Sequence, residues 1–511
     1  MIQISQIRLK PDSPETALHQ AVYKALRLSP KDTCRIEIAK QSIDSRHKPD
    51  ILYIYSVHVS DILLNGKKPV DEAAWIKKLK NRDITPVTKK GYTFPAVSRQ
   101  ILKEEDRPVI IGFGPAGMFA ALKLAEAGLR PIVFERGDSI EQRKKEVEAF
   151  WQGGALNTES NVQFGEGGAG TFSDGKLNTA IKDPTGRIHE VLRIFAEFGA
   201  DSRILYVNKP HIGTDVLAKV VQNIRKKITA CGGEVHFQTK LTAIYEKDGA
   251  VNGITVFDRA ENKSFTHACN TVCLAIGHSA RDTFSMLKRH GIYMEAKSFA
   301  VGVRIEHPQK MINMDLYGEP ENELLGAASY KVTHKCANGR GVYSFCMCPG
   351  GYVVNASSEP GRLAVNGMSY QARDSRNANS AMIVTVTPED FPDKGVLGGV
   401  EFQRDLEKKA WELGEGKIPV QLFGDFCKNQ ASEALGEVTP CMKGEYILTN
   451  VRSVLPKAVG DSIEEGVRAF GKRISEFDRE DALLSGIESR TSSPVRIVRD
   501  QKLTANMAGI Y

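Results

Sequence analysis

Residues 109–117, Val-Ile-Ile-Gly-Phe-Gly-Pro-Ala-Gly, decide the fold that we predict for this chain. A short apolar strand enters three glycines with the spacing GxGxxG, a helical pattern follows, and Pro131–Phe134 forms a second apolar strand. This order is the βαβ unit of a Rossmann-like fold. Gly112 makes the tight turn, Gly114 leaves room for a pyrophosphate, and Gly117 lets the helix approach the strand.

Glu135 ends the second strand, 18 residues after the last glycine of this fingerprint. An acid at this position accepts hydrogen bonds from an adenosine ribose and disfavours a 2′-phosphate. Residues 165–170, Gly-Glu-Gly-Gly-Ala-Gly, match the same spacing, but turn residues and no helical pattern follow them. This second match is either a glycine loop packed against the fold or a loop beside the same cofactor.

The segment that follows distinguishes FAD from NAD. Leu241–Glu246 and Val251–Phe257 flank an Asp-Gly turn and predict a hairpin, and a third strand is expected near Phe265–His267. A buried strand, Thr271–Ile276, then ends at Gly277. This is the insertion pattern of FAD-binding domains of the glutathione-reductase type. FAD is therefore favoured, because simple NAD domains continue with further βα units.

The first fifth of the chain is predicted to be a separate module. Residues 1–107 hold 20 basic and 13 acidic residues, so the whole net charge of +7 lies there. Their pattern is β-α-β-β, with a helix that starts at Ser13-Pro14-Glu15, where a hydroxyl caps the helix and proline takes its first position. The stretch Thr85–Asp106 is predicted to be a linker.

Composition bounds the class of protein. The 511 residues are 41% hydrophobic and 26% charged, which is typical of a soluble globular chain and excludes long disorder. No stretch approaches the ~18–20 apolar residues of a transmembrane helix. The nine cysteines form no CxxC pair, which indicates reduced thiols in a cytoplasm and no metal site.

Five segments give the chain a wider resemblance. It resembles a family of bacterial FAD-dependent oxidoreductases labelled "NAD(FAD)-utilizing dehydrogenases", whose members are largely uncharacterised. With the N-terminal module the similarity spans nearly the whole chain. The segments that carry it are residues 109–117, 165–177 (Gly-Glu-Gly-Gly-Ala-Gly-Thr-Phe-Ser-Asp-Gly-Lys-Leu), 274–282 (Leu-Ala-Ile-Gly-His-Ser-Ala-Arg-Asp), 345–351 (Phe-Cys-Met-Cys-Pro-Gly-Gly) and 488–497 (Glu-Ser-Arg-Thr-Ser-Ser-Pro-Val-Arg-Ile).

The resemblance implies an α/β fold in which a Rossmann-like FAD-binding domain carries an inserted α+β substrate domain. The expected division is a basic N-terminal module with its linker at 1–107, the FAD-binding domain at 108–290, the insertion at 291–484 and a return to the FAD-binding domain at 485–511. Family members continue past Tyr511 with a Gly-Glu-Gly turn that faces the flavin. This sequence stops at Tyr511, so we expect the natural gene product to be longer.

The candidate cofactor-binding residues follow from the fingerprint and the resemblance. They are Gly112, Gly114, Pro115, Ala116, Gly117, Glu135, Arg136, Gly167, Gly168, Gly170, Thr171 and Gly277. No catalytic residue is assigned, and no metal site is expected. His278 is the candidate for acid–base work, because it follows a strand's carboxyl end and histidine titrates near neutrality; the alternative is a histidine that only bonds a loop carbonyl.

Two further sets of residues carry alternatives. Cys346 and Cys348 form a CxC pair that is either redox-active or a pair of reduced structural thiols. Four arginines are either anchors for a carboxylate substrate or structural ion-pair partners. They are Arg304, Arg373, Arg490 and Arg496.

The function expected is a cytoplasmic FAD-dependent dehydrogenase that passes a hydride between a small-molecule donor and the flavin. NAD(P)H is a candidate reductant, but no second fingerprint provides its site. Six basic residues of the N-terminal module, Lys67, Lys68, Lys77, Lys78, Lys80 and Arg82, form either a solvated face or a docking face for RNA or an acidic partner. No aromatic residues are interleaved, so nucleic acid is not expected. The alternatives are a flavoprotein of RNA modification and a non-catalytic FAD-binding sensor.

Overall fold

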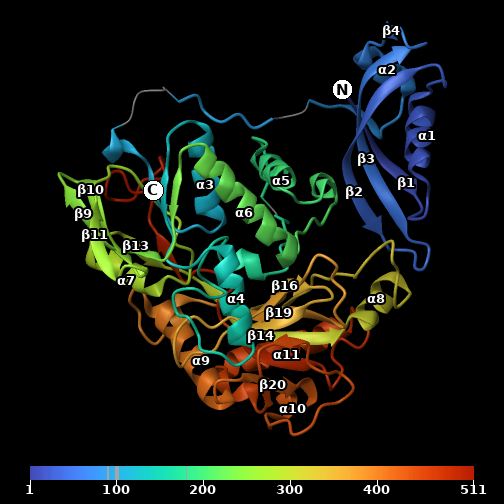
Figure 1. Cartoon of the computed structure of the whole chain (residues 1–511). Coiled ribbons are helices and arrows are strands. Elements are labelled where there is room, and N and C mark those ends of the chain that lie inside the picture. Colours follow the sequence, from blue (N-terminus) through green and yellow to red (C-terminus); the bar gives the residue numbers. More distant parts are fainter. Residues whose placement is uncertain (89–90, 98–102, 180) are drawn as a thin grey trace. The chain divides into compact units, whose positions relative to one another are not determined.

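The computed structural model describes residues 1–88, 91–97, 103–179 and 181–511 (Figure 1). Packing divides the chain into two compact units. The first contains Met1–Thr93, Lys176–Ile212 and Ile312–Ala328, and the second contains Phe94–Gly175, Gly213–Met311 and Ser329–Tyr511. The glycine fingerprint at residues 112–117 lies in the second unit.

The first unit contains an antiparallel sheet with its own apolar core. The strand order is β2-β3-β1-β5, with β4 beside β3. Val22 and Leu26 of the first helix and Val57 and Val59 of β3 are among its fully buried residues, which follows from four-residue spacing on a helix and alternation on a strand. The elements are β1 (Ile2–Leu9), α1 (Glu15–Leu26), β2 (Thr33–Asp44), β3 (Leu52–Leu64), β4 (Lys68–Pro69), α2 (Glu72–Leu79) and β5 (Ile84–Pro86), with α5 (Arg187–Glu197) also in this unit.

Three sequence expectations for this region need correction. The predicted linker begins inside β5, which pairs with β1 through Gln3 and Thr85; residues 89–90 and 98–102 of that stretch lie outside the described residues. Ser13 does not cap α1, whose N-cap residue is Pro14 and receives no side-chain hydrogen bond. Residues 176–212 and 312–328, expected in the FAD-binding and inserted domains, belong to the first unit. The independence of the N-terminal module stays a prediction.

A parallel sheet forms the base of the second unit. Its order is β12-β6-β7-β8, and every neighbouring pair is parallel. Helices α3 and α6 pack against each other beside these strands (Figure 1). The elements are β6 (Val109–Ile111), α3 (Pro115–Glu126), β7 (Ile132–Phe134), α4 (Ile140–Trp151), α6 (Thr214–Ala230), β8 (Glu234–His236) and β12 (Val272–Leu274). The βαβ unit predicted from the glycine fingerprint is confirmed.

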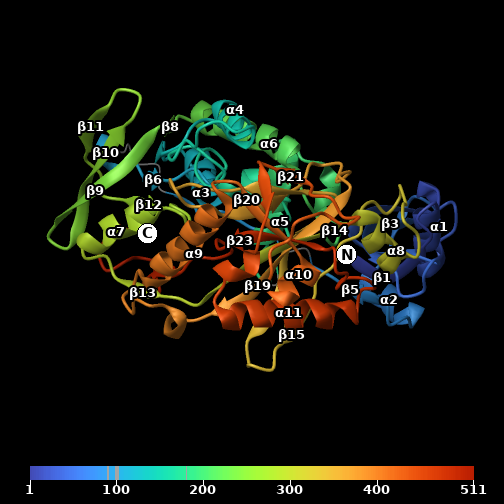
Figure 2. The ribbon, with the colours of Figure 1, turned by 90° about the horizontal axis from the view of Figure 1, so that it is seen from below.

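The predicted hairpin and third strand are also present. They form the antiparallel sheet β11-β10-β9, from β9 (Thr239–Lys247), β10 (Ala250–Asp258) and β11 (Lys263–His267) (Figure 2). Val109 and Ile111 of β6 share one core with this sheet and with α7 (Arg281–Arg289). Because side chains alternate along a strand, Ile110 points the other way and lies against α3 at Gly117. The parallel sheet is thus covered on both faces.

The chain end returns to this sheet, as predicted. The backbone N–H groups of Val272 and Leu274 donate to Gly509 and Tyr511, and Tyr511 donates back to Val272. These bonds place the last residues beside β12 in parallel orientation.

The rest of the second unit is built on a seven-stranded sheet of order β15-β16-β19-β14-β23-β20-β22. Helix α11 packs on four of its strands, and α9 contacts two others (Figures 1 and 2). The elements are β13 (Met294–Ala296), β14 (Phe299–Pro308), β15 (Thr333–Lys335), β16 (Gly341–Cys348), β17 (Tyr352–Asn355), β18 (Val365–Met368), β19 (Asn377–Val386), α9 (Gly398–Gly414), β20 (Ile418–Leu422), α10 (Phe423–Lys428), β21 (Met442–Lys443), β22 (Tyr446–Leu448), α11 (Lys457–Gly471), β23 (Leu483–Glu488) and β24 (Val495–Ile497). Helix α8 (Gln309–Tyr317) begins in this unit, and from Ile312 on it belongs to the first unit. In the described part of the chain no helix has both the length and the apolar character of a membrane span.

Candidate dinucleotide-binding site

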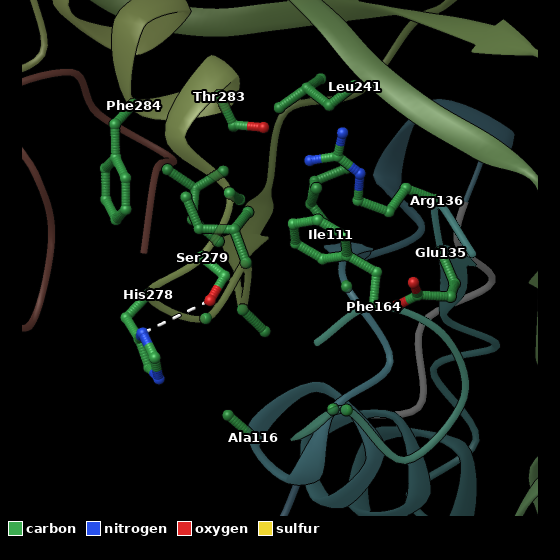
Figure 3. A pocket seen from close by; sticks show the side chains of 18 of the residues that line it. Ile111, Ala116, Glu135, Arg136, Phe164, Leu241, His278, Ser279, Thr283 and Phe284 are labelled. Atoms are coloured by element: carbon green, nitrogen blue, oxygen red, sulfur yellow. Dashed lines mark hydrogen bonds between the residues drawn. The ribbon is translucent and has the colours of Figure 1, made fainter. Parts of the chain in front are cut away.

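A cavity of about 500 Å³ opens at the carboxyl ends of β6 and β12. This is where open α/β sheets bind their ligands. Five segments line it: the glycine turn after β6, the second glycine loop, the start of β9, the turn after β12 and the segment after β23. Glu135 and Arg136 lie on one side of it, and His278 and Ser279 lie on the other (Figure 3).

The glycines of the fingerprint are required by close backbone contacts. Gly112 has φ +97°, and a Cβ on it would lie 2.5 Å from the carbonyl oxygen of Ala275. A Cβ on Gly117 would lie 2.0 Å from the oxygen of Gly112. Gly114 is the N-cap residue of α3, and no side chain caps this helix. The positive end of α3 therefore meets the cavity with backbone groups that suit a phosphate.

Glu135 lines the cavity and is almost completely buried. Its Oε2 accepts a hydrogen bond from the backbone N–H of Phe113 at 2.7 Å. Its Oε1 accepts from Gly137 at 2.9 Å and from Gly165 at 3.0 Å. A carboxylate offers about four acceptor sites, so one remains for a ligand hydroxyl. Glu135 also joins the fingerprint turn to the second glycine loop, a role that its sequence position did not indicate.

Replacing Glu135 with alanine should weaken FAD binding by about 10- to 150-fold, because hydrogen bonds to a charged group contribute roughly 1.5–3 kcal/mol. The variant also leaves three backbone N–H groups without their acceptor, so its thermal midpoint should fall. Fluorescence titration of the flavin measures the dissociation constant. Glu246→Ala, an exposed residue of β9, is the control. Unchanged affinity in a folded Glu135→Ala protein would mean that the ribose is held elsewhere.

Arg136 is held in place by two carboxylates. Its Nη1 and Nη2 donate to Asp282 of α7 at 2.8 and 2.9 Å, and its Nε donates to Glu159 at 2.8 Å. Its guanidinium lies 4.2 Å from the ring centre of Phe164. Burial acts to raise the pKa of Asp282, but the hydrogen bonds and charge of Arg136 outweigh it and lower that pKa to about 2. Arg136 and Asp282 are therefore both charged at neutral pH, and the paired Arg136 side chain forms part of the cavity wall.

The second glycine loop lies against the first. Gly168 and Gly170 line the cavity, and a Cβ on Gly168 would lie 2.9 Å from the Cα of Gly114. The loop therefore packs against the fingerprint turn and also lines the cavity, which is where the alternative of a loop beside the same cofactor requires it. Its shape is fixed by Arg143 of α4, whose side chain is fully buried. The guanidinium donates four hydrogen bonds of 2.7–3.0 Å to the carbonyl oxygens of Asn161, Val162, Glu166 and Gly168.

His278 lies beside Ser279 at 3.5 Å between Nδ1 and Oγ, and Ser279 donates to Gln163 at 3.0 Å (Figure 3). Burial, followed by the positive charges of Arg490 and Arg281, lowers the pKa of His278 to about 4. Its imidazole is therefore neutral at pH 7 and does not titrate near neutrality as an ordinary histidine does.

The four arginines considered as substrate anchors all have carboxylate partners. Each therefore has the ion pair that the structural alternative requires, and Arg496 also lines the cavity. The pairs are Arg304 with Glu488 (2.8 Å), Arg490 with Glu407 (2.9 Å), Arg373 with Asp174, and Arg496 with Glu295. Cys346 and Cys348 are both in the reduced form, and neither takes part in a disulfide.

Most of the predicted cofactor-binding residues come together in the cavity. Gly112, Gly114, Pro115, Ala116, Glu135, Arg136, Gly168, Gly170 and Gly277 line it, as does His278. Gly117, Gly167 and Thr171 do not line it and shape the loops behind its wall; a Cβ on Gly167 would lie 2.1 Å from the Thr171 hydroxyl. Sequence reasoning missed Arg143, Gln163, Phe164 and Arg499.

Comparison with known proteins places the chain. A protein from Clostridium beijerinckii described as uncharacterized is 47% identical over 515 residues, which are 100% of this chain and 93% of the relative. The chain belongs to the family of that protein. A family model described as "FAD-dependent protein, C-terminal domain-like" matches residues 298–491, and a domain of unknown function matches residues 1–60.

Solved structures with partial similarity include two FAD proteins. A glycerol-3-phosphate dehydrogenase from Bacillus halodurans in complex with FAD is 13% identical, covers 74% of this chain and 68% of its own, and has a TM-score of 0.29. A myxobacterial chondrochloren halogenase is 10% identical, covers 56% of this chain and 54% of its own, and has a TM-score of 0.30.

FAD is the cofactor of this family member. The cavity fits it, because the uncapped helix, the two glycine turns and the buried acid match a dinucleotide's pyrophosphate and ribose. The fold is accordingly an FAD-binding Rossmann-like fold, and the matched domain together with the glycine turns supports an FAD-dependent redox enzyme.

Proposed function

We propose that this protein is an FAD-dependent dehydrogenase that transfers a hydride between a small-molecule donor and the flavin. The observation that carries the proposal is the meeting of the fingerprint turn, the second glycine loop and Glu135 in one cavity. When bound, FAD supplies the acceptor for two electrons, and the protein supplies binding and orientation. We further propose that the FAD-binding domain is of the glutathione-reductase type, that residues 291–484 are an inserted substrate domain, and that the chain matches the "NAD(FAD)-utilizing dehydrogenase" label.

The residues around the cavity have distinct roles in this proposal. The first turn of α3, entered through Gly112 and Gly114, would hold the pyrophosphate by backbone N–H groups and the helix dipole. Glu135 would accept from a ribose hydroxyl with its remaining acceptor site. The second glycine loop, fixed by Arg143, would close the cavity against water on the side of Gly168.

His278 would act as a neutral hydrogen-bonding group. With a pKa of about 4 it carries no proton to give as a cation at neutral pH. General acids and bases are most effective when their pKa is near the working pH. We therefore propose that His278 orients a ligand through one ring nitrogen, and that any proton leaving the donor goes to another group or to water.

The proposal includes a small-molecule donor, a cytoplasmic setting, and no nucleic acid or membrane partner. NAD(P)H is kept as a candidate donor. At the Arg136 end of the cavity the three carboxylates of Glu135, Glu159 and Asp282 outnumber the two cations Arg136 and Lys240, which disfavours a further phosphate there. The same charges would favour FAD over a 2′-phosphorylated dinucleotide.

Anaerobic reduction of the flavin-loaded protein tests the proposal. Absorbance at the flavin band is followed while NADH, NADPH and a panel of small alcohols, amines and acids are added one at a time. Bleaching by one donor, with saturation as its concentration rises, supports a dehydrogenase. Reduction by dithionite but by no donor of a broad panel would indicate a non-catalytic FAD protein. Salt-dependent RNA binding by the full chain would indicate the RNA-modification alternative.

A further inference from the structure

The two thiols of the CxC segment lie together at a break in a strand. Along β16, Phe345 pairs with Ala381 and Cys348 pairs with Asn379, so β16 holds one extra residue, a β-bulge. Cys346 occupies the bulge with φ +43°, in the left-handed region that residues with a Cβ rarely adopt. Bulges and strained residues of this kind are concentrated at functional positions.

The bulge affects the distance between the Cα atoms of Cys346 and Cys348, which decides whether a disulfide can join them. Two residues apart on a regular strand, Cα atoms are about 6.6–6.8 Å apart, at the far limit of what a disulfide spans. A bulge bends the strand and shortens that separation. The Cys348 thiol donates a hydrogen bond to the Cys346 carbonyl oxygen, with 3.2 Å between Sγ and O, and it lies close enough to the Cys346 thiol for that group to raise its pKa. The sulfurs are thus already neighbours in the reduced form.

A buried cation supports this pair. The Arg304 Nη1 lies 3.7 Å from the Cys348 Sγ and donates to the Cys346 carbonyl oxygen at 3.0 Å. Arg304 is fully buried and ion-pairs with Glu488. A guanidinium at this position stabilises a thiolate while it forms and holds the bulge.

The two thiols differ in access, which sets their order of reaction. Cys348 is completely buried, and burial raises the pKa of its thiol well above the usual value. Cys346 is partly exposed, and its neighbour Phe345 is 45% exposed. An external sulfur can therefore reach Cys346 first, while Cys348 waits behind it as the resolving thiol.

We propose that Cys346 and Cys348 form a reversible dithiol–disulfide pair that exchanges with low-molecular-weight disulfides. The Cys346 thiolate attacks one sulfur of the external disulfide, forms a mixed disulfide and releases one external thiol. The Cys348 thiolate then attacks the Cys346 sulfur, which forms the internal S–S bond and releases the second external thiol. Two cysteines lose two electrons and two protons, and the external disulfide gains both as two thiols.

The pair is connected to the cavity by a short path. Asp174, four residues after cavity-lining Gly170, ion-pairs with Arg373 and is close enough to Cys348 for its charge to raise the pKa of that thiol. A Cβ on Gly350 would lie 1.8 Å from the backbone oxygen of Arg373, so the turn after Cys348 packs tightly on the backbone of the residue that pairs with Asp174.

Equilibration of the full chain with glutathione buffers, from fully reduced to fully oxidised, tests the proposal. Samples are quenched with an alkylating reagent, and peptides are mapped by mass spectrometry. We expect both cysteines to lose alkylation together at one buffer ratio, in a peptide that is two hydrogens lighter. Persistence of both free thiols in the most oxidising buffer, or a stable glutathione adduct on Cys346 of the parent protein, would overturn the proposal.

Three variants sharpen the test. Cys348→Ser removes the resolving thiol, so glutathione on Cys346 should rise about tenfold over the parent. In Cys346→Ser, Cys348 should stay a thiol at every ratio. Cys427→Ser changes another partly exposed cysteine and should leave the pair unaffected. Should a variant fail to fold, peptide mapping of the parent protein still decides, and the result does not depend on finding a donor for the flavin.

Discussion

Valine in place of Gly114 should abolish FAD retention without unfolding the protein. The backbone of Gly114 has φ −73° and ψ −175°, an extended conformation open to any residue. A Cβ there would have the Cα of Gly168 as its nearest atom, at 3.6 Å, which is ordinary contact. The valine methyl groups would occupy the space between these two cavity-lining glycines, where a pyrophosphate must approach the backbone. We expect affinity to fall by about 100-fold or more, roughly 2.7 kcal/mol.

Absorbance of the purified protein and a flavin titration measure this effect, and circular dichroism checks the fold. Gly117→Ala is an instructive contrast, because its Cβ would lie 2.0 Å from a carbonyl oxygen and must move the backbone. Gly91→Val changes a glycine with open space around it and should retain FAD. A Gly114→Val protein that keeps a full complement of flavin would exclude this turn as the pyrophosphate site.

The parts of the fold that the sequence predicts are those governed by local pattern. The strands around Gly112, the hairpin at Asp248-Gly249 and the returning chain end all rest on spacing, turn chemistry and apolar runs. The pairing of 206–208 with the edge of β2 through Gln41 is non-local. No local pattern indicates such a pairing, so the sequence alone predicts residues 176–212 as part of the FAD-binding domain.

The candidate site divides in the same way. Glycines with positive φ and an acid at the end of a strand can be recognised from the sequence alone, and these residues line the cavity. The position of His278 after a strand is visible in the sequence, but its pKa depends first on burial and then on the positive charges of Arg490, which comes from a distant segment, and of Arg281. The burial and the charges around a side chain are properties of the folded chain, so the pKa of His278 cannot be predicted from the sequence.

The burial and the role of Arg143 are also not predictable from the sequence. It follows Glu141 and precedes Lys144 and Lys145 in α4, and in sequence it resembles a solvent-facing charge. Glu141, Lys144 and Lys145 are exposed, whereas Arg143 is completely buried. Only the carbonyl groups that its guanidinium meets identify its role.

Arg143→Met is therefore expected to collapse the second glycine loop. Methionine has a similar length and no donor, so four buried carbonyl oxygens lose their partner. Buried unpaired groups cost about 1–3 kcal/mol each, and we expect the free energy of unfolding to fall by at least about 3 kcal/mol. Because Gly168 is one of the groups released and lies against Gly114, FAD affinity should fall with it, by about 100-fold.

Denaturant unfolding and flavin titration separate the two effects, with affinity measured per folded molecule. Lys144→Met removes a cation from the next position of the same helix, on its exposed side, and should change neither quantity. Arg143→Lys keeps the positive charge. Burial lowers the pKa of Arg143 to about 10, so the native guanidinium is charged at neutral pH. Lysine offers its donors from one point, so it cannot span acceptors that meet a planar guanidinium on three nitrogens. We expect it to recover stability in part and FAD affinity hardly at all; parental affinity in both variants would show that the loop holds its shape without Arg143.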